Sequence, residues 1–206
     1  LLINMNEPLG RAVGNALEVE ECVRILRGEA AEAARPVLDL SLELSAHMLW
    51  LANVDKTTEA AHERLRGVLG SGKALECLQQ NIEAQGGDPR VCDDPASFLP
   101  LVSETVKVES PRSGFITRVD TTEIGHAIAA IGGGRVRIED TIDPTVGFTS
   151  ELKIGDRVNT GDAIGVVYCA DSGNGEEAAR RIQVAYHIGD APPAEAIKLV
   201  KEIVNE

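Results

Sequence analysis

Apolar residues recur every three to four positions through about the first ninety residues, which is the spacing of amphipathic helices. The strongest such stripe consists of Val37, Leu40, Leu44, Met48 and Leu51. Glycines and capping threonines separate the stretches, so we predict helices over residues 15–27, 33–52, 57 or 58 to 69, and 74–84. Residues 1–3 are all apolar and predict the end of a strand. The first half is therefore predicted to be helical, without a sheet of its own.

From about Asp93 the pattern changes to β-branched residues that alternate with polar ones, which is typical of half-buried strands. Pro95 and Pro100 mark a linker before this region. We predict strands over residues 105–108, 114–119, 163–169 and 184–188, and helices over 121–131, 176–182 and 194–204. The pairs Gly155-Asp156 and Gly161-Asp162 predict two tight hairpin turns. The second half is therefore predicted to be a small, strand-rich α+β domain.

The formal net charge of −13 argues against a nucleic-acid-binding surface and against binding to anionic membranes. Four scattered cysteines, Cys22, Cys77, Cys92 and Cys169, contain no CxxC pair, which favours reduced, mostly buried thiols over a zinc site or a disulfide framework. No apolar run approaches the roughly 18 residues of a membrane helix, and no signal peptide is recognisable. We therefore expect a cytoplasmic protein.

Two glycine-containing motifs have structural interpretations. Gly132-Gly133-Gly134-Arg135 follows a predicted helix, whereas a phosphate-binding loop places its glycines before one, so we predict a helix end and a sharp turn. The Gly-Asp turns resemble those of lipoyl and biotinyl carrier domains, but the chain lacks the Met-Lys pair that such carriers modify. These turns are therefore predicted to be structural.

The histidines and one pair of aspartates are also predicted to be structural. His47, His62, His126 and His187 do not show the spacing of a metal site such as HxxxH. Asp140 and Asp143 flank Thr141 and are a possible catalytic pair, but aspartates in such segments more often accept hydrogen bonds from nearby backbone amides. We expect these two to fix turns.

The segment 6–21 reads as a tight loop that leads into a helix. Pro8 fixes one backbone angle, Gly10 and Gly14 permit angles closed to other residues, and Asn15 is a candidate cap for the helix. Loops of this kind can present backbone carbonyls and amides to a ligand. On local chemistry alone, an ordinary connection is the more frequent explanation.

Several stretches together resemble one family. The run from Asn6 to Val19, NEPLGRAVGNALEV, is similar to the central signature of the pyrimidine nucleoside phosphorylases, the family that includes thymidine phosphorylase. Residues 84–88 (AQGGD), 132–135 (GGGR), 140–143 (DTID) and 146–148 (VGF) match the same family in order and spacing. The resemblance extends along essentially the whole chain.

This resemblance implies a fold and a reaction. The implied fold is α+β: residues 1–92 are the helical remainder of the phosphorylase α/β domain, 93–104 a linker, and 105–206 the C-terminal α+β domain, hammerhead or barrel-sandwich-like. Family members cleave a pyrimidine nucleoside such as thymidine with inorganic phosphate, giving the base and a sugar 1-phosphate. They need no organic cofactor and are typically homodimers.

The resemblance also implies an absence. The family's phosphate loop, a Lys-His-Ser-Thr-Gly-Gly-type run, and the Arg, Ser and Lys that hold the pyrimidine have no counterpart in these 206 residues. We expect no catalytic residue in this segment and no phosphorolysis by the segment alone. The apolar start at Leu1 is interpreted as the interior of a strand of a longer protein.

One site is implied residue by residue. Some family members bind a monovalent cation, potassium, beside the phosphate loop. The matching ligands are the backbone carbonyls of Leu9 and Ala12 and the carboxylate of Glu21. Oxygen ligands suit such a hard cation. The phosphate loop would complete the site.

Two alternatives stay open. A nucleoside-monophosphate phosphorylase of the AMP type shares the C-terminal domain. A non-catalytic assembly module would carry the same fold without the reaction.

Overall fold

The computed structural model describes residues 1–100, 102, 104–194 and 198–204, and the chain forms two compact units. Unit 1 contains residues 1–3, 20–99 and 199–206, and unit 2 contains residues 4–19 and 100–198. The α1 helix, Asn15–Leu26, begins in unit 2 and ends in unit 1. The compact units thus do not follow the chain order of the predicted domains, because residues 4–19 pack with the second half.

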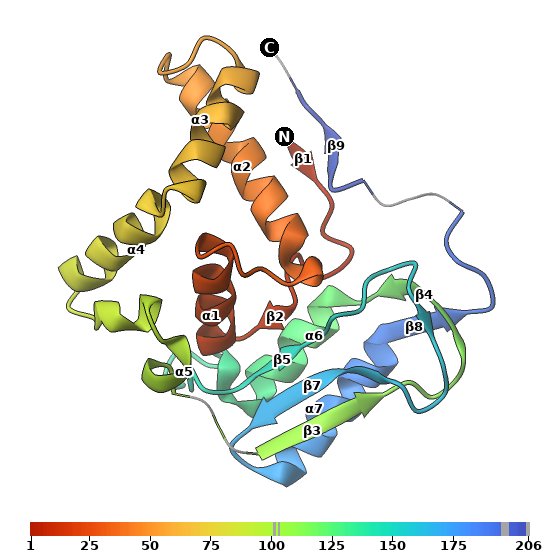
Figure 1. Cartoon of the computed structure of the whole chain (residues 1–206). Helices are drawn as coiled ribbons and strands as arrows, with labels where there is room; N and C mark the ends of the chain where they lie inside the picture. Colours follow the sequence, from red (N-terminus) through yellow and green to blue (C-terminus); the bar gives the residue numbers. More distant parts are fainter. Residues whose placement is uncertain (101, 103, 195–197, 205–206) are drawn as a thin grey trace. The chain divides into compact units, whose positions relative to one another are not determined.

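Unit 1 is mainly helical (Figure 1). Its two longest helices, α2 and α3, pack against each other. Besides the end of α1, its described residues form β1 (Leu2–Ile3), the 3-10 turn Glu32–Ala34, α2 (Arg35–Leu51), α3 (Thr58–Gly70), α4 (Lys73–Ala84), the 3-10 turn Pro89–Cys92, α5 (Pro95–Phe98) and β9 (Val200–Glu202). The predicted start of α3 is confirmed, because Thr57 Oγ1 accepts a hydrogen bond from the Ala60 amide at 3.2 Å.

The end of the chain corrects one prediction. Residues 194–204 were expected to form a helix, but Val200–Glu202 form strand β9, which pairs antiparallel with β1. The register places Leu2 opposite Glu202 and Ile3 opposite Val200. Strand pairing with a distant segment overrides the local helical pattern, and it gives the helical unit a small sheet of its own. Residues 195–197 of the expected helix lie outside the described residues.

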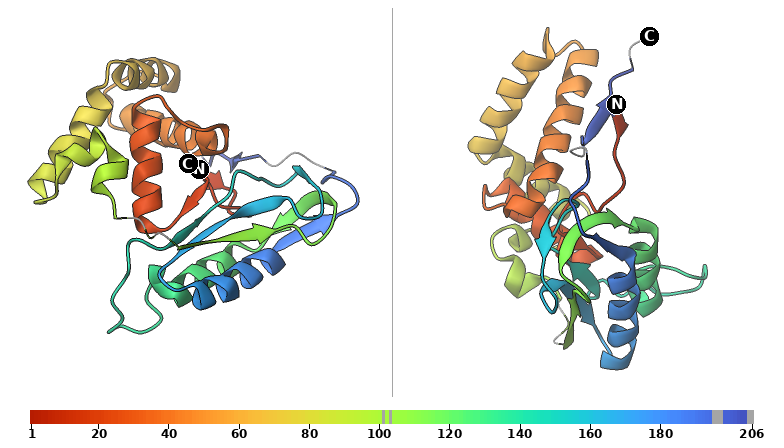
Figure 2. Two further views of the ribbon diagram at one scale, coloured as in Figure 1. Left: turned by 60° about the horizontal axis from the view of Figure 1, so that its bottom comes forward. Right: turned by 90° about the vertical axis from the view of Figure 1, so that its right-hand side faces the viewer.

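Within its described residues, unit 2 contains two antiparallel sheets, the start of α1 and helices α6 and α7, so the predicted α+β class is confirmed. The strand orders are β2-β5-β7-β3 and β6-β4-β8. The elements are β2 (Ala12–Val13), β3 (Glu104–Glu109), β4 (Gly114–Val119), α6 (Thr121–Ile128), a π-helical segment (Ala129–Gly133), β5 (Gly147–Thr149), β6 (Arg157–Val158), β7 (Ala163–Cys169), α7 (Ser172–Ala185) and β8 (Tyr186–Gly189). Helices α6 and α7 lie on one side of β3 and β7 (Figure 2).

Helix α7 is longer than predicted because of its cap. The Asp171 side chain accepts a hydrogen bond from the Asn174 amide at 2.9 Å, which starts the helix at Ser172 rather than near Glu176. Gly175 then lets the helix approach β7, since a Cβ atom there would lie 2.3 Å from the Cys169 sulfur. The first turn of α7 is therefore defined by its cap and by contact with the sheet.

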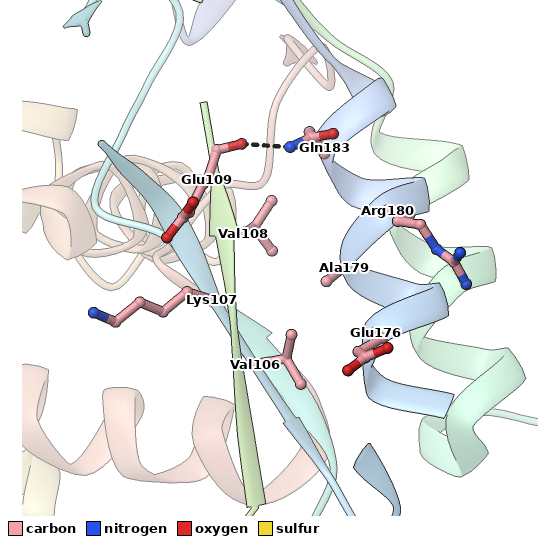
Figure 3. Close-up of a pocket in the computed structure, with 8 residues that line it drawn as sticks. All are labelled: Val106, Lys107, Val108, Glu109, Glu176, Ala179, Arg180 and Gln183. Atoms are coloured by element: carbon pink, nitrogen blue, oxygen red, sulfur yellow. Dashed lines mark hydrogen bonds between the residues drawn. The ribbon is translucent and has the colours of Figure 1, made fainter. Parts of the chain in front are cut away.

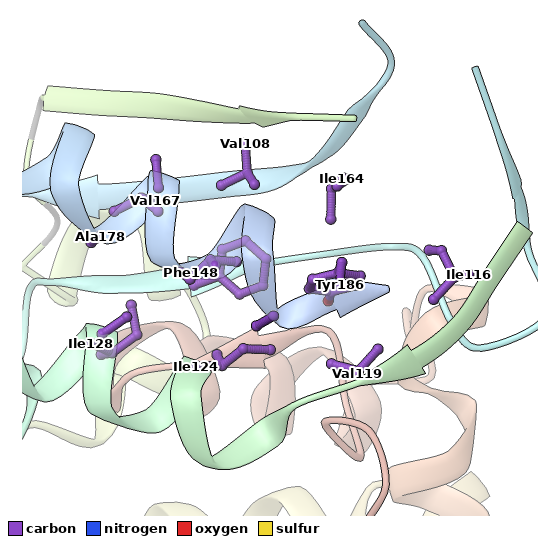
Figure 4. Packing of buried hydrophobic residues seen from close by; sticks show 14 of the residues in the cluster. Val108, Ile116, Val119, Ile124, Ile128, Phe148, Ile164, Val167, Ala178 and Tyr186 are labelled. Carbon is purple, nitrogen blue, oxygen red and sulfur yellow. The ribbon is translucent and has the colours of Figure 1, made fainter. Parts of the chain in front are cut away.

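The core of unit 2 is aliphatic around one aromatic pair. The Phe148 and Tyr186 rings meet edge to face, with centroids 6.4 Å apart. Ile124 and Ile128 of α6 pack on one side of Phe148, and Val108 and Val167 lie on the other (Figure 4). Unit 1 has a smaller buried cluster around Val23, Val91 and Cys92. Unit 2 therefore buries more apolar side chains in its core than unit 1 does.

The cysteines only partly follow the expectation. Cys92 and Cys169 are buried, and burial raises the pKa of both thiols. Cys22 and Cys77 are exposed, so the prediction of mostly buried thiols is wrong for these two. They lie on the outer faces of amphipathic helices.

Candidate functional site

The candidate site is the loop that precedes α1, residues 4–14, which we call the N-terminal loop. It belongs to unit 2 and ends in strand β2. Ala12 pairs with Thr149 and Val13 with Phe148 of β5, and the Ser150 amide donates to the Arg11 carbonyl at 2.8 Å. The loop is adjacent to α1 in sequence. In the structure it is also paired with β5, a strand about 135 residues later.

Two glycines permit this pairing. Gly14 has φ of +131°, and a Cβ atom on it would lie 2.5 Å from the Val146 carbonyl oxygen and 2.8 Å from Gly147 Cα. A Cβ atom on Gly147 would in turn lie 2.5 Å from the Val13 carbonyl oxygen. The two backbones therefore meet without room for a side chain. The glycine at position 14 is required by this contact as well as by its backbone angle.

Helix α1 starts at Asn15, as predicted, but the role of Asn15 differs from the expected cap. Asn15 is the first helical residue rather than the cap before it. The Gly14 amide donates to the Glu18 carboxylate at 2.9 Å, and the Ala16 amide donates to the Pro144 carbonyl at 3.0 Å. Two amides at the beginning of the helix thus already have partners within unit 2.

A lysine from the second half lies among the carbonyls of the loop. The Lys153 ammonium donates to the carbonyl oxygens of Pro8 at 2.6 Å, Leu9 at 3.3 Å and Gly10 at 2.8 Å. Beside it, the Ile154 amide donates to the Glu7 carboxylate at 2.7 Å. The loop therefore presents its carbonyls to a positive charge, as the sequence suggested, but this charge belongs to the chain itself.

Sequence reasoning missed Lys153. It lies more than 140 residues after the carbonyls that it contacts, and no local motif links the two. A lysine beside a Gly-Asp turn is an ordinary surface residue in any sequence pattern. Only the tertiary structure brings its ammonium to the loop.

The three predicted cation ligands are found in different surroundings. The Leu9 carbonyl accepts from Lys153. Ala12 is a buried residue of β2, and Glu21 is a buried residue of α1, 7% exposed. Leu9 and Ala12 belong to unit 2 and Glu21 to unit 1. Within the described part of the chain, no group of three or more His, Cys, Asp or Glu side chains has the arrangement of a metal site.

Asp140 and Asp143 fix turns, as predicted. Asp140 accepts hydrogen bonds from the amides of Val136 at 3.0 Å and Arg137 at 2.7 Å. Asp143 accepts from the Thr145 amide at 2.9 Å and from its hydroxyl at 2.6 Å. Both carboxylates are thus engaged by neighbouring residues. Gly132, with φ of +104°, ends the helical segment before them, which confirms the predicted helix end.

His47 and His62, which were predicted to be structural, share one carboxylate. Glu43 of α2 contacts His47 Nε2 at 3.1 Å through one oxygen and His62 Nε2 of α3 at 2.9 Å through the other. The His47 ring also meets Trp50 edge to face, at 6.2 Å between ring centroids. These contacts join α2 to α3, so both histidines have a structural role.

A cavity lies between β3 and α7, but its lining does not bring together a set of polar groups like the one at the N-terminal loop. Its volume is about 280 Å³, at the lower end for a small-molecule site. Val106 and Val108 point toward the helix, Lys107 points away, and Gln183 Nε2 donates to the Glu109 carbonyl at 2.7 Å (Figure 3). This hydrogen bond joins α7 to the end of the edge strand β3. We therefore interpret the cavity as part of the packing between the strand and the helix.

Comparison with known proteins defines the class. Residues 115–189, all within unit 2, match the pyrimidine nucleoside phosphorylase C-terminal domain. The chain therefore belongs to the pyrimidine nucleoside phosphorylases as a segment from their C-terminal part.

A particular relative supports the same assignment. The chain is 36% identical over 203 residues to the thymidine phosphorylase of Rhizobium meliloti (strain 1021). The alignment covers 98% of this chain and 46% of that protein, so the chain spans about half the length of the curated relative it matches. Among the helices that the structure describes, none is both long and apolar enough to cross a membrane.

Proposed function

We propose that the chain is the C-terminal segment of a thymidine phosphorylase, which converts thymidine and phosphate to thymine and 2-deoxyribose 1-phosphate. The observation that carries the proposal is the similarity to a protein of that name along 98% of the chain. The organisation of the N-terminal loop adds support. The segment with the family signature is paired to β5 and bonded to Lys153, as expected if the C-terminal domain serves to position it.

In this proposal the segment supports the site and does not perform the chemistry. Phosphate and nucleoside would be bound mainly by parts of the protein outside these 206 residues. Unit 2 would hold the N-terminal loop in one conformation, so that the groups packed on it stay aligned. The segment alone is then inactive, and the complete protein acts as a cytoplasmic homodimer.

We also propose that the complete protein binds potassium through the carbonyls of Leu9 and Ala12 and the carboxylate of Glu21. Oxygen donors of this kind suit a hard cation. The Leu9 carbonyl oxygen has two lone pairs, and its distance to the Lys153 ammonium is the longest of the three. It therefore keeps the capacity to bind an ion. When bound, the ion would supply positive charge beside the phosphate site.

The reaction is tested with the complete protein. Thymidine, uridine and AMP are each incubated with phosphate, and release of the free base is measured. Thymine release with little turnover of AMP is expected. Preferential phosphorolysis of AMP would favour the nucleoside-monophosphate phosphorylase alternative, and no turnover of any of the three would favour an assembly module. Robust thymidine phosphorolysis by the purified 206-residue chain would contradict the proposed inactivity of the segment.

The potassium site is tested separately. Phosphate KM and thermal stability of the complete protein are measured in potassium, sodium and choline chloride at equal ionic strength. Tighter phosphate binding in potassium is expected, and Glu21→Gln should remove the difference. Identical behaviour in all three salts would refute the assignment of these ligands.

A further inference from the structure

Lys153 makes the contacts that a bound monovalent cation would make. An ammonium group has three hydrogen-bond donors and no acceptor, and here it contacts three backbone carbonyls of consecutive residues, Pro8 to Gly10. Two of the distances, 2.6 and 2.8 Å, are those of short, charge-assisted hydrogen bonds. Three carbonyls of consecutive residues thus face one positive charge.

The backbone around Lys153 is fixed on both sides. Its own amide donates to the Asp156 carboxylate at 2.7 Å, and the next amide, of Ile154, donates to Glu7 at 2.7 Å. Gly155 then adopts φ of +105° and donates to the Ile116 carbonyl at 2.7 Å. The lysine therefore extends from a rigid turn, so only its side chain loses conformational freedom when the ammonium contacts the loop.

We propose that Lys153 is a positioning residue that acts as a tethered monovalent cation for the N-terminal loop. Its ammonium holds the carbonyls of Pro8, Leu9 and Gly10 together, so that the loop keeps its conformation in this chain without a dissolved ion. A potassium ion in the complete protein then adds to a loop that is already formed. The consequence for phosphorolysis rests on the proposed function, whereas the effect on the loop does not.

The test is hydrogen exchange of the 206-residue chain, followed by mass spectrometry. Peptides that cover residues 4–14 and the Ser150 and Ile154 amides report on the loop, because both amides donate to it. The variants are Lys153→Met, which keeps most of the aliphatic stem, and Lys107→Met. Lys107 is exposed on β3 and carries the same charge, so its variant controls for the loss of one positive charge. Each is measured in potassium, ammonium and choline chloride at equal ionic strength.

The wild-type chain and Lys107→Met should exchange at the same rate in all three salts. Lys153→Met should exchange about ten- to a hundredfold faster in choline, as expected from losing charged hydrogen bonds. Potassium or ammonium should restore part of the protection, because a dissolved ion can then enter among the carbonyls.

Two outcomes would overturn the proposal. One is wild-type exchange rates in Lys153→Met. The other is slower exchange of the wild-type loop when potassium replaces choline, because the loop would then depend on a dissolved ion despite its lysine. The second measurement needs no variant, so it decides the matter even if Lys153→Met does not fold. Neither outcome bears on whether the complete protein cleaves thymidine, which the phosphorolysis assay decides.

Discussion

Replacing Gly14 by alanine should detach the N-terminal loop from β5. The added Cβ atom meets the Val146 carbonyl oxygen at 2.5 Å and Gly147 Cα at 2.8 Å, and both are backbone atoms. It also places a side chain at φ of +131°, where alanine is strained. The substitution therefore combines a backbone cost with a steric cost, and the structure offers a control for each.

Gly161→Ala isolates the backbone cost. Gly161 has φ of +83°, and nothing lies within 4 Å of its added Cβ atom. We expect a loss of about 1–3 kcal/mol in the free energy of unfolding, as for other residues held in sparsely populated backbone conformations.

Gly147→Ala isolates the steric cost, because its backbone angle is ordinary and its Cβ atom would lie 2.5 Å from the Val13 carbonyl oxygen. Overpacking of this kind costs about 1–3 kcal/mol. Gly14→Ala should then cost about 2–6 kcal/mol, the sum of the two ranges.

The assay is hydrogen exchange at the Ser150 amide, which donates to the Arg11 carbonyl across the β2–β5 pair. Each 1.4 kcal/mol of lost stability corresponds to about tenfold faster exchange. Gly14→Ala should exchange faster than either control, while peptides of unit 1 stay unchanged. If Gly14→Ala and Gly161→Ala exchange equally fast, the close approach of the two backbones has no energetic consequence and the reasoning fails.

Three further predictions concern other parts of the chain. Burial raises the pKa of Tyr186 to about 12, so a contribution of about 3 kcal/mol to stability is present below pH 10 and is lost as the pH rises toward 12. Tyrosinate absorbance of the folded chain should show one group titrating near pH 12, and a midpoint near 10 for every tyrosine would contradict this. Glu43→Ala should lower the stability of unit 1 by about 1–2 kcal/mol and change the tryptophan fluorescence, because two histidines lose their shared partner, whereas Glu63→Ala on the exposed side of α3 should change neither. Asp140→Ala should speed tryptic cleavage after the two arginines of the exposed loop that precedes it, since two amides lose their acceptor, and unchanged cleavage would show that the carboxylate does not order this loop.

The secondary structure was largely predictable because its causes are local. Helical spacing and a threonine cap define α3, and alternation of β-branched residues defines β3 and β4. Asp140 and Asp143 bond amides two to four residues away, so their structural role was also readable from the sequence. One exception, β9, forms by pairing with the opposite end of the chain, which no local pattern reports.

The sequence by itself determined the α+β class, the family and the loop that carries the family signature. It could not determine what holds that loop, because pairing of β2 with β5 and the contact of Lys153 with Pro8 join residues more than 130 positions apart. Such contacts depend on how the chain folds back on itself and leave no periodic signal. Only the tertiary structure placed the Lys153 ammonium among the carbonyls of Pro8, Leu9 and Gly10, of which Leu9 is also one of the three cation ligands implied by the family resemblance.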